Sequence, residues 1–460
     1  MKNLLFFILP VLLLASELSQ AQESYEIPMG KRQRQAPNGA ERLADGVMLL
    51  ANNELILLDD NFQVRHRAFI DVDVEGQRVT RRYLGLRQTP TQYILHFEVS
   101  GVKSFEDVRF REIIEVVLVH KETFEQKRQY HFPYFERYRP IRHFVLENDF
   151  FSFAVNIEQK KLRILRSFGG EHIHAYTFDL DRRLWREIVD FTMMPISANK
   201  SPNGETSSPT SVWGTPLDVS NSLSRLRTYL DSERELMLTI DRKDLMIYRF
   251  KMDPTRPGAG EITSQTVYRP LARELGHIQN SYIYDNHLYI LIKGPEAVML
   301  DVFKLGTMEP IASLSSVATD SSKSIKPHTL VEENVESWNH NILTDEERIR
   351  RIVARGATGF IVTEKAQYLE VTIGFYGDIV RNPRHYYYRV MLDKTTFKSL
   401  GSPSTYERTH ALRKYVLENR MQKNISPYTN LTYFRKEGAD YFGHQHRREM
   451  KYVFKKIAPD

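Results

Sequence analysis

A strand–turn–strand unit recurs along the chain and limits what it can fold into. In the first copy, the apolar run 55–58 is followed by a polar turn at 59–61 and then by Phe62, which opens a second strand. Asp, Asn, Gly and Thr favour tight chain reversal at such turns. Five further copies pair runs 116–119, 176–180, 246–252, 299–305 and 387–392 with turns that begin at residues 120, 181, 253, 306 and 393. The repeat predicts an all-β chain built from successive antiparallel units.

Another strand-like run lies ahead of each unit, at residues 47–50, 93–97, 150–155, 236–240, 287–292 and 368–373. Most are preceded by one more run, which gives about four short strands per unit, the composition of a propeller blade. In this strand rhythm, residues 44–400 resemble six-bladed β-propellers of the TolB-like and NHL-like kind. The resemblance implies six blades; seven, with one blade made partly from the C-terminal tail, is the alternative.

The two ends of the chain are expected to close the ring. Residues 22–43 are polar and basic, so the first unit is short of strands, whereas segments 431–435 and 451–457 both have the pattern of strands. Strands from the tail that complete the first blade would remove exposed sheet edges. Two helices are also predicted: a short inserted one at about 345–355, opened by a Thr344/Glu347 capping box, and a basic C-terminal one at about 405–422.

The N-terminus has the three parts of a secretory signal. Lys2 supplies the positive charge, residues 4–15 are apolar, and Ser19-Gln20-Ala21 places small residues at the cleavage positions. We therefore expect a signal peptide at 1–21, a polar basic segment at 22–43, a propeller body at 44–400, and a basic helix with closing strands at 401–460. The expected location is the periplasm, the cell surface or the medium.

The chain contains no cysteine. This excludes a disulfide framework, a thiolate zinc site, a cysteine nucleophile and an acylated lipoprotein anchor. Large secreted animal domains usually carry disulfides, so the absence favours a bacterial envelope. Beyond the signal peptide no apolar run approaches the roughly 20 residues of a membrane span, so the mature chain is predicted to have no transmembrane segment.

The positive charge is concentrated in the tail. Residues 401–460 hold 12 Lys and Arg against six acids, a net +6 that equals the net charge of the whole chain. The tail is predicted to bind an anionic partner, either an acidic protein face or an anionic envelope polymer, and not nucleic acid, because the protein is exported. A merely solvated surface is the alternative. The candidate contacts are Lys423, Arg435, Lys436, Arg447, Arg448, Lys455 and Lys456. The interleaved Tyr433, Phe434, Tyr441 and Phe442 are expected to anchor the closing strands.

No chemical motif specifies a reaction. His172 and His174 share one face of an expected strand, as do His444 and His446, but neither pair has a third ligand nearby, so no metal is predicted. The motifs of serine hydrolases, zinc proteases and P-loop enzymes are absent. Tyr386-Tyr387-Tyr388 is interpreted as packing between blades, and residues 332–336 as a solvated linker. We predict no catalytic residue and no cofactor.

The favoured function is therefore a non-enzymatic binding or scaffold protein, because propellers present recognition loops on a rigid ring. The alternative is a glycan-active hydrolase or lyase with its site at the funnel of the propeller. Acids, histidines and arginines that converge in a central pocket would favour the enzyme.

Overall fold

Almost all regular structure in the computed structural model is β. Within the described part of the chain there are two α-helices and one short 3-10 helix. The residues described are 24–28, 39–43, 46–51, 54–70, 73–74, 77–100, 112–131, 138–146, 148–168, 172–193, 211–212, 226–231, 233–241, 244–267, 278–294, 297–334, 340–355, 357–376, 384–403, 432–436, 439–446 and 451–457. No helix among them is long and apolar enough to cross a membrane.

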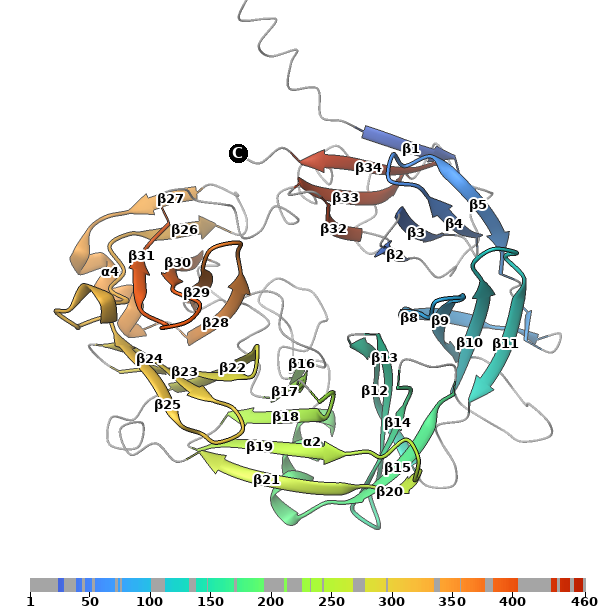
Figure 1. Ribbon diagram of the computed structural model, residues 1–460, viewed down its shortest axis with the longest axis horizontal. Helices are drawn as coiled ribbons and strands as arrows, with labels where there is room; N and C mark the ends of the chain where they lie inside the picture. Colours follow the sequence, from blue (N-terminus) through green and yellow to red (C-terminus); the bar gives the residue numbers. More distant parts are fainter. Residues whose placement is uncertain are drawn as a thin grey trace, which may run out of the picture. The chain divides into compact units, whose positions relative to one another are not determined.

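The described strands form seven sheets of four or more strands and one two-stranded ribbon (Figure 1). The chain divides into two compact units. The first comprises Met1–Leu86, Pro90–Phe132 and Glu407–Asp460, and the second comprises Arg87–Thr89 and Pro133–Tyr406. The expected count of six blades is not confirmed. The tail strands belong to a sheet of their own with β1 (Ser24–Pro28) and do not complete the first blade. The alternative of seven blades also placed tail strands in a further blade.

The first unit contains three four-stranded antiparallel sheets. Two are meanders of consecutive strands: β2 (Gly39–Leu43), β3 (Gly46–Ala51), β4 (Glu54–Leu58) and β5 (Val64–Phe69), then β8 (Thr80–Gln88), β9 (Gln92–Ser100), β10 (Glu112–His120) and β11 (Gln126–His131). The third, called the terminal sheet here, joins β32 (Thr432–Lys436), β33 (Ala439–His446) and β34 (Lys451–Ile457) to β1 (Ser24–Pro28). The ribbon is β6 (Asp73–Val74) with β7 (Gln77–Arg78).

The second unit contains four sheets of four to six strands. The first consists of β12 (Tyr138–Leu146), β13 (Asp149–Asn156), β14 (Lys161–Arg166), β15 (His174–Asp179) and β20 (Gly258–Ala259), and the second of β16 (Ser211–Val212), β17 (Leu226–Leu230), β18 (Leu236–Asp241), β19 (Leu245–Lys251) and β21 (Glu261–Val267). The third consists of β22 (Ile278–Tyr284), β23 (His287–Lys293), β24 (Val298–Lys304) and β25 (Pro310–Ser315). The fourth consists of β26 (Leu330–Asn334), β27 (His340–Leu343), β28 (Ala357–Glu364), β29 (Leu369–Tyr376), β30 (Arg384–Leu392) and β31 (Ser399–Gly401).

Both ends of the chain contribute to one sheet, but not to the sheet that was predicted. The tail strands pair with β1, where Glu26 lies opposite Val453, and the first sheet is instead completed by β2. The sequence of β2, GAERL, has little apolar pattern, so its strand state comes from pairing with β3 and not from intrinsic preference. The segment 22–43 therefore contains two strands that sequence reasoning missed.

Neighbouring sheets pack face to face through apolar layers, which we call seams. Alternate residues of a middle strand enter opposite seams: Val47 and Leu49 of β3 pack toward the terminal sheet, whereas Met48 and Leu50 pack toward the β8–β11 sheet. The second unit repeats this arrangement, with seams between each consecutive pair of its sheets. Consecutive antiparallel sheets packed face to face are the units from which β-propellers are built, so the sheets fit that fold.

Five of the six predicted strand–turn units are confirmed as antiparallel strand pairs joined by the predicted turn. In four of them the hydrophobic residue after the turn has a positive φ: Phe62 (60°), Phe124 (58°), Met308 (57°) and Phe397 (56°). We call these four residues the turn pins. This backbone conformation costs a bulky residue about 1–2 kcal/mol, so packing must compensate for it.

The turn pins gain that packing from the preceding sheet. Phe62 stacks on Tyr25 with ring centroids 4.4 Å apart and lies 5.2 Å from both Tyr441 and Phe454, all in the terminal sheet. Phe397 lies 4.8 Å from the ring of His287 in the same way. An aspartate shapes several of these turns; the main-chain N–H of Thr396 donates to Asp393 Oδ1 at 2.7 Å and lowers the pKa of that carboxyl.

The third predicted unit was wrong, because a helix replaces the expected strand. Asp181 Oδ1 accepts hydrogen bonds from the N–H groups of Arg183 and Leu184, both at 2.7 Å, and so caps α2 (Arg182–Met193). Leu184 and Ile188 are buried in the seam beside β15. Asp is as suitable at an N-cap as in a hairpin turn, and the spacing of the two apolar residues fits a helix.

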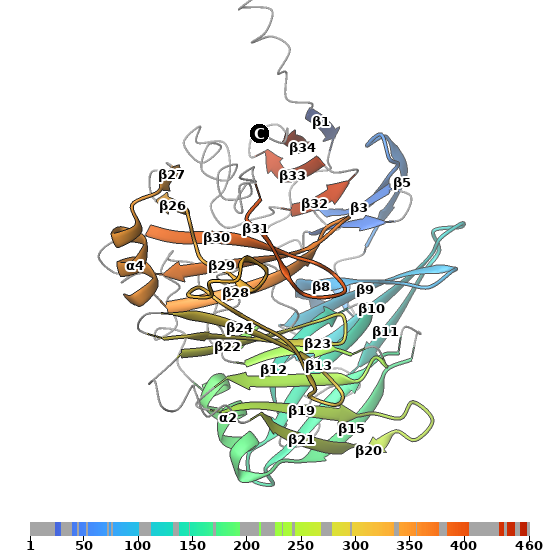
Figure 2. The same ribbon diagram turned by 60° about the vertical axis from the view of Figure 1, so that its left-hand side comes forward.

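The short inserted helix is confirmed as α4 (Glu346–Arg355), which lies beside β26 and β27 in Figure 2. Its cap differs from the prediction, since Asp345 and not Thr344 accepts the hydrogen bond, from the N–H of Arg348 at 2.6 Å. Ile349 and Val353 pack into the neighbouring seam. The helix expected at 405–422 lies outside the described residues.

The turn pins give a first testable prediction. Phe62→Ala removes an aromatic ring that is 5% exposed and should lower the free energy of unfolding by about 3–5 kcal/mol. Phe69→Ala is the control, because that ring is 54% exposed and its loss should cost about 0.5 kcal/mol. Urea denaturation measures both. Equal losses in the two variants would show that Phe62 does not hold the terminal sheet to its neighbour.

Candidate functional site

The structure describes only part of the predicted anionic-partner site. Lys423, Arg447 and Arg448 lie outside the described residues. The other four candidates are in the terminal sheet: Arg435 and Lys436 end β32, and Lys455 and Lys456 lie near the end of β34. The pairing order β32-β33-β34 places β33 between the two basic pairs. Whether they form one binding surface stays a prediction.

The terminal sheet holds these basic residues on a well-packed framework. Tyr452 and Phe454 of β34 are fully buried against the β2–β5 sheet, as is most of Tyr441, which confirms the anchoring role predicted for Tyr441. Lys455 and Lys456 directly follow the buried residues Tyr452, Val453 and Phe454, and their own side chains are half-buried. Lys451, which was not predicted, forms an ion pair with Glu26 of β1 at 2.7 Å and so joins the two ends of the chain.

The other residues singled out from the sequence are two histidine pairs and the run of three tyrosines. His174 begins β15, and His172 lies just before that strand. The described His, Asp and Glu residues include no group of three that could hold a metal. His444 and His446 lie in β33, and nothing is described of their side chains. Tyr388 is buried in the layer between its own sheet and the β22–β25 sheet, and it stacks on Phe375 with centroids 5.9 Å apart, so the predicted packing role is confirmed for this tyrosine.

The interpretation of residues 332–336 as a solvated linker was wrong for its first residues. Glu332 lies in β26 and is 3% exposed. Its Oε1 accepts a hydrogen bond from the Tyr386 hydroxyl at 3.0 Å and pairs with Arg348 of α4 at 3.2 Å. Glu332 and Glu333 therefore belong to a strand. The Glu332 carboxylate fixes α4 onto that sheet.

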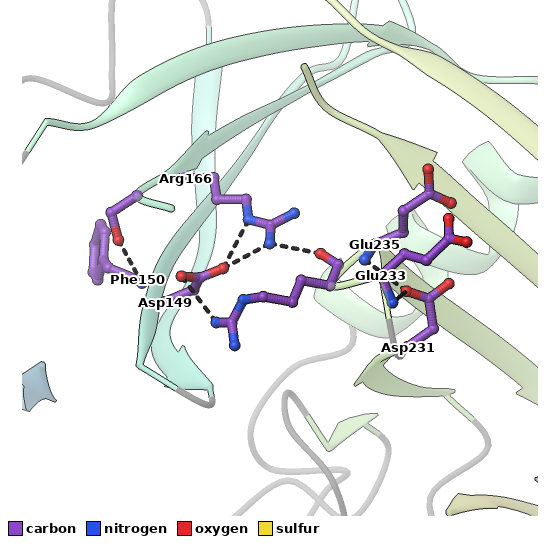
Figure 3. Close-up of polar contacts among 8 residues, drawn as sticks. Asp149, Phe150, Arg166, Asp231, Glu233 and Glu235 are labelled. Atoms are coloured by element: carbon purple, nitrogen blue, oxygen red, sulfur yellow. Dashed lines mark hydrogen bonds and ion pairs between the residues drawn. The ribbon is translucent and has the colours of Figure 1, made fainter. Parts of the chain in front are cut away.

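A buried charged cluster surrounds Asp149, at the start of β13 (Figure 3). Its carboxylate is fully buried and lies between two guanidinium groups. Arg166 donates to Oδ2 from Nε at 3.0 Å and from Nη2 at 2.6 Å, and Arg234 approaches Oδ1 at 3.1 Å. Arg166 is almost fully buried, with its guanidinium 4.2 Å from the Phe168 ring centroid. Burial lowers the pKa of Arg166, and Asp149 opposes that shift.

Arg87 adds a third guanidinium to this environment. It is fully buried, and burial lowers its pKa to about 10 while the negative charge of Asp149 acts in the opposite direction. The adjacent Asn148 is also fixed, because its side-chain amide exchanges two hydrogen bonds with the main chain of Gln88, at 2.6 and 2.9 Å. The turn before β13 is therefore held on both sides.

Arg234 reaches Asp149 from the hairpin turn between β17 and β18. Its φ of 60° is left-handed, where Gly or Asn is usual. Asp231 shapes this turn by accepting the N–H groups of Glu233 and Glu235 at 3.0 and 2.8 Å. The Arg234 carbonyl in turn accepts a hydrogen bond from Arg166 Nη2 at 2.6 Å. The main chain and the side chain of one residue thus both join the β12–β15 sheet to the next one.

This arrangement supports a structural role and not proton transfer. A carboxylate held between guanidinium groups has neighbours that stay protonated near neutral pH, and a buried charge of this kind is stable only while it is paired. Burial, followed by the charge of Asp231, raises the pKa of Glu235 on the same turn. Asp231 itself is committed to the turn and to Arg249, whose Nη1 lies 3.0 Å from its Oδ2.

Two other buried ion pairs follow the same rule. In the first unit, Arg81 and Glu115 bond through both guanidinium and carboxylate edges, one contact being 3.0 Å. In the second, Arg227 donates to Asp241 Oδ2 at 2.5 Å and to the carbonyl of Ser281 at 2.6 Å, which crosses from β17 to β22. Sequence reasoning missed all of these pairs. The available signal was a charged residue inside a run of strand hydrophobics, as at Glu115 in EIIEVVLVH.

Comparison with known proteins adds no functional assignment. No protein-family model and no curated protein matches the chain. Solved structures with similarity include the WD40 domain of SCAP from fission yeast (9% identity, 90% of this chain and 82% of that one, TM-score 0.30) and a Trypanosoma rangeli sialidase (8%, 95% and 59%, 0.29). An uncharacterised protein from Listeria monocytogenes is also similar (8%, 93% and 93%, 0.28). Likeness at these scores carries no argument about what this chain does.

The Asp149 cluster predicts unequal roles for its two arginines. Arg166→Met leaves a buried carboxylate without its main partner and should lower the free energy of unfolding by about 3–5 kcal/mol. Arg234→Gly is the matched variant at the same carboxylate. It loses a pair whose arginine side chain is 47% exposed but relieves the left-handed backbone, so the net change should stay within about 1 kcal/mol. Chemical denaturation compares the two. A larger loss for Arg234→Gly would contradict the structural assignment.

Proposed function

We propose that this protein is an exported, non-enzymatic binding or scaffold protein of a bacterial envelope, whose sheets are the blades of a β-propeller. In this proposal residues 1–21 are removed on export and the mature protein resides in the periplasm or at the cell surface. The observation that carries the proposal is the terminal sheet. It joins the two ends of the chain and presents a basic strand on a fixed framework.

The distribution of charge supports a scaffold. The buried carboxylates of Glu115, Asp149, Asp241 and Glu332 are each paired with an arginine, and the Asp149 and Asp241 pairs also bond across to the next sheet. Charges used in this way stabilise one arrangement of sheets. Recognition is then assigned to exposed strands and loops, which rigid propellers present at their two ends.

The tail supports a specific class of partner. Tyr452 and Phe454 fix β34 in the core, so Lys455 and Lys456 are held on a strand whose position does not depend on a ligand. An ordered basic strand loses less conformational entropy on binding than a mobile tail does. We propose that it contributes, with Lys423, Arg435, Lys436, Arg447 and Arg448, to a site for an acidic protein face or an anionic envelope polymer.

Processing gives the first test of this proposal. Protein recovered from the envelope of an expressing bacterium should begin at Gln22, because Ala21 ends the proposed signal peptide. Intact-mass analysis measures the N-terminus directly. Ala21→Arg, which removes the small residue at the cleavage position, should retain the uncleaved chain in the membrane fraction. Recovery of wild-type protein that still carries residues 1–21 would contradict export by a cleaved signal.

Charge neutralisation gives the second test. Replacing Lys423, Arg435, Lys436, Arg447, Arg448, Lys455 and Lys456 with glutamine changes the net charge from +6 to −1 (6 − 7). Retention on immobilised poly-L-glutamate should be lost, and wild-type retention should fall steeply as salt is raised above about 0.1 M. The matched control replaces seven exposed basic residues outside the tail, namely Lys127, Lys160, Arg182, Lys251, Arg256, Lys304 and Lys323. It should retain binding. Equal loss in the two variants would show an effect of net charge and contradict a site in the tail.

A further inference from the structure

A cavity of about 570 Å³ opens in the seam between two sheets of the second unit, at their outer strands. Nearer the inner strands the same seam is filled by hydrophobic residues, including Leu288 and Ile290 of β23. Toward β21 and β25 the two sheets no longer fill the space between them. The lining of the cavity includes Gln265 and Val267 of β21, Asp301 and Phe303 of β24, and Ile311 and Ser313 of β25.

One lining residue is unexpected for this position. In β24, Met299, Asp301 and Phe303 alternate with the residues of the other face, and Asp301 lies opposite Ile290 in the ladder. A side chain directed into this seam would ordinarily be apolar. Asp301 is instead an acid that is only 3% exposed, and its Oδ1 accepts a hydrogen bond from the Ser313 hydroxyl at 2.6 Å. A departure from the packing pattern of this kind is a signal of function.

The cavity lining combines polar and apolar groups. Asp301, Ser313 and Gln265 supply polar side chains, and Phe303 and Ile311 supply apolar ones. Thr266 is opposite Met246 in the ladder, so its side chain faces the other seam. Ile311 is 39% exposed at the rim, which is unusual for a branched hydrophobic residue on a strand. The volume is within the range of small-ligand sites, about 300–1,000 Å³.

The polar groups select among ligand classes. A carboxylate only accepts hydrogen bonds, so the ligand must donate to Asp301. An alkylammonium ion could donate there, but it offers no acceptor to the amide N–H groups of Gln265. A sugar hydroxyl both donates and accepts. A sugar ring also has C–H faces that match the apolar lining.

We propose that this cavity binds a neutral saccharide, with Asp301 accepting hydrogen bonds from its hydroxyls and Phe303 and Ile311 contacting the ring. This site is separate from the basic tail and does not depend on the function proposed above. It would give the protein a second ligand, so that the second unit recognises a glycan while the tail holds an anionic partner.

The test uses the full mature chain and defined sugars. Ligand-observed NMR and calorimetry are run with glucose, galactose, N-acetylglucosamine, cellobiose and chitobiose, and with putrescine as the alkylammonium probe. At least one sugar should bind with a Kd in the millimolar range or below. Asp301→Asn should weaken that binding about tenfold or more, since a charge-assisted hydrogen bond is lost. Ser313→Ala, at the exposed rim, should weaken it several-fold.

Two controls separate the outcomes. Asp285→Asn alters an acid in the β22–β23 turn, outside the cavity lining, and should leave sugar affinity unchanged. The seven-residue tail variant should also bind sugar as the wild type does, which distinguishes this site from the tail. Thermal melts check folding, and Ser313→Ala keeps the test decisive where Asp301→Asn does not fold. Binding of putrescine alone, binding of no sugar, or equal affinity in wild type, Asp301→Asn and Ser313→Ala would each overturn the proposal.

Discussion

Burial of the middle strands on both faces is the constraint on which the rest of this structure depends. All eight residues of β13 and all six of β18 are buried, and β23 is buried from Leu288 to Lys293. Such a strand needs a packed layer on each side. For β18 and β23 the two neighbouring sheets of the second unit supply both layers. The turn pins follow from the same requirement. Phe62 and Phe397 accept an unfavourable backbone conformation because their rings complete the seam with the preceding sheet.

Buried ion pairs fix the register between neighbouring sheets, which apolar contacts alone would specify less closely. Apolar layers tolerate sliding, whereas the contacts of Arg227 with Asp241 and with the carbonyl of Ser281 fix one register between two sheets. The Asp149 cluster does the same one seam away. These pairs hold the sheets in one arrangement whether or not they add net stability. A chain without disulfides has particular need of such contacts.

The sequence predicted the repeated hairpins because their signal is local. Apolar runs and turn residues such as Asp59 and Asp393 specify the two strands of each hairpin from a few residues, and the strand ahead of each hairpin was equally clear. It failed where partners are distant in the chain. β1 and β34 pair across more than 420 residues, and β2 is a strand only because β3 lies beside it. Asp181 satisfied the rules for both a turn and a helix cap, and the apolar spacing that follows was read with the wrong period. The cavity lining could not be predicted, because Asp301 and Gln265 meet only when two sheets pack.

The pairing of the first and last strands is the claim that most directly tests this account. The chain has no cysteine, so a double variant, Glu26→Cys with Val453→Cys, reports on one register. Directly opposed residues in an antiparallel pair have Cα atoms about 4.5–5.5 Å apart, within the range of a disulfide. Mild oxidation of the folded protein should form an intramolecular bond, seen as a mass loss of two hydrogen atoms. Glu26→Cys with Lys455→Cys, displaced by two residues along the strand, should not form it. No bond in the first variant, or equal yields in both, would contradict the pairing of β1 with β34 in the terminal sheet.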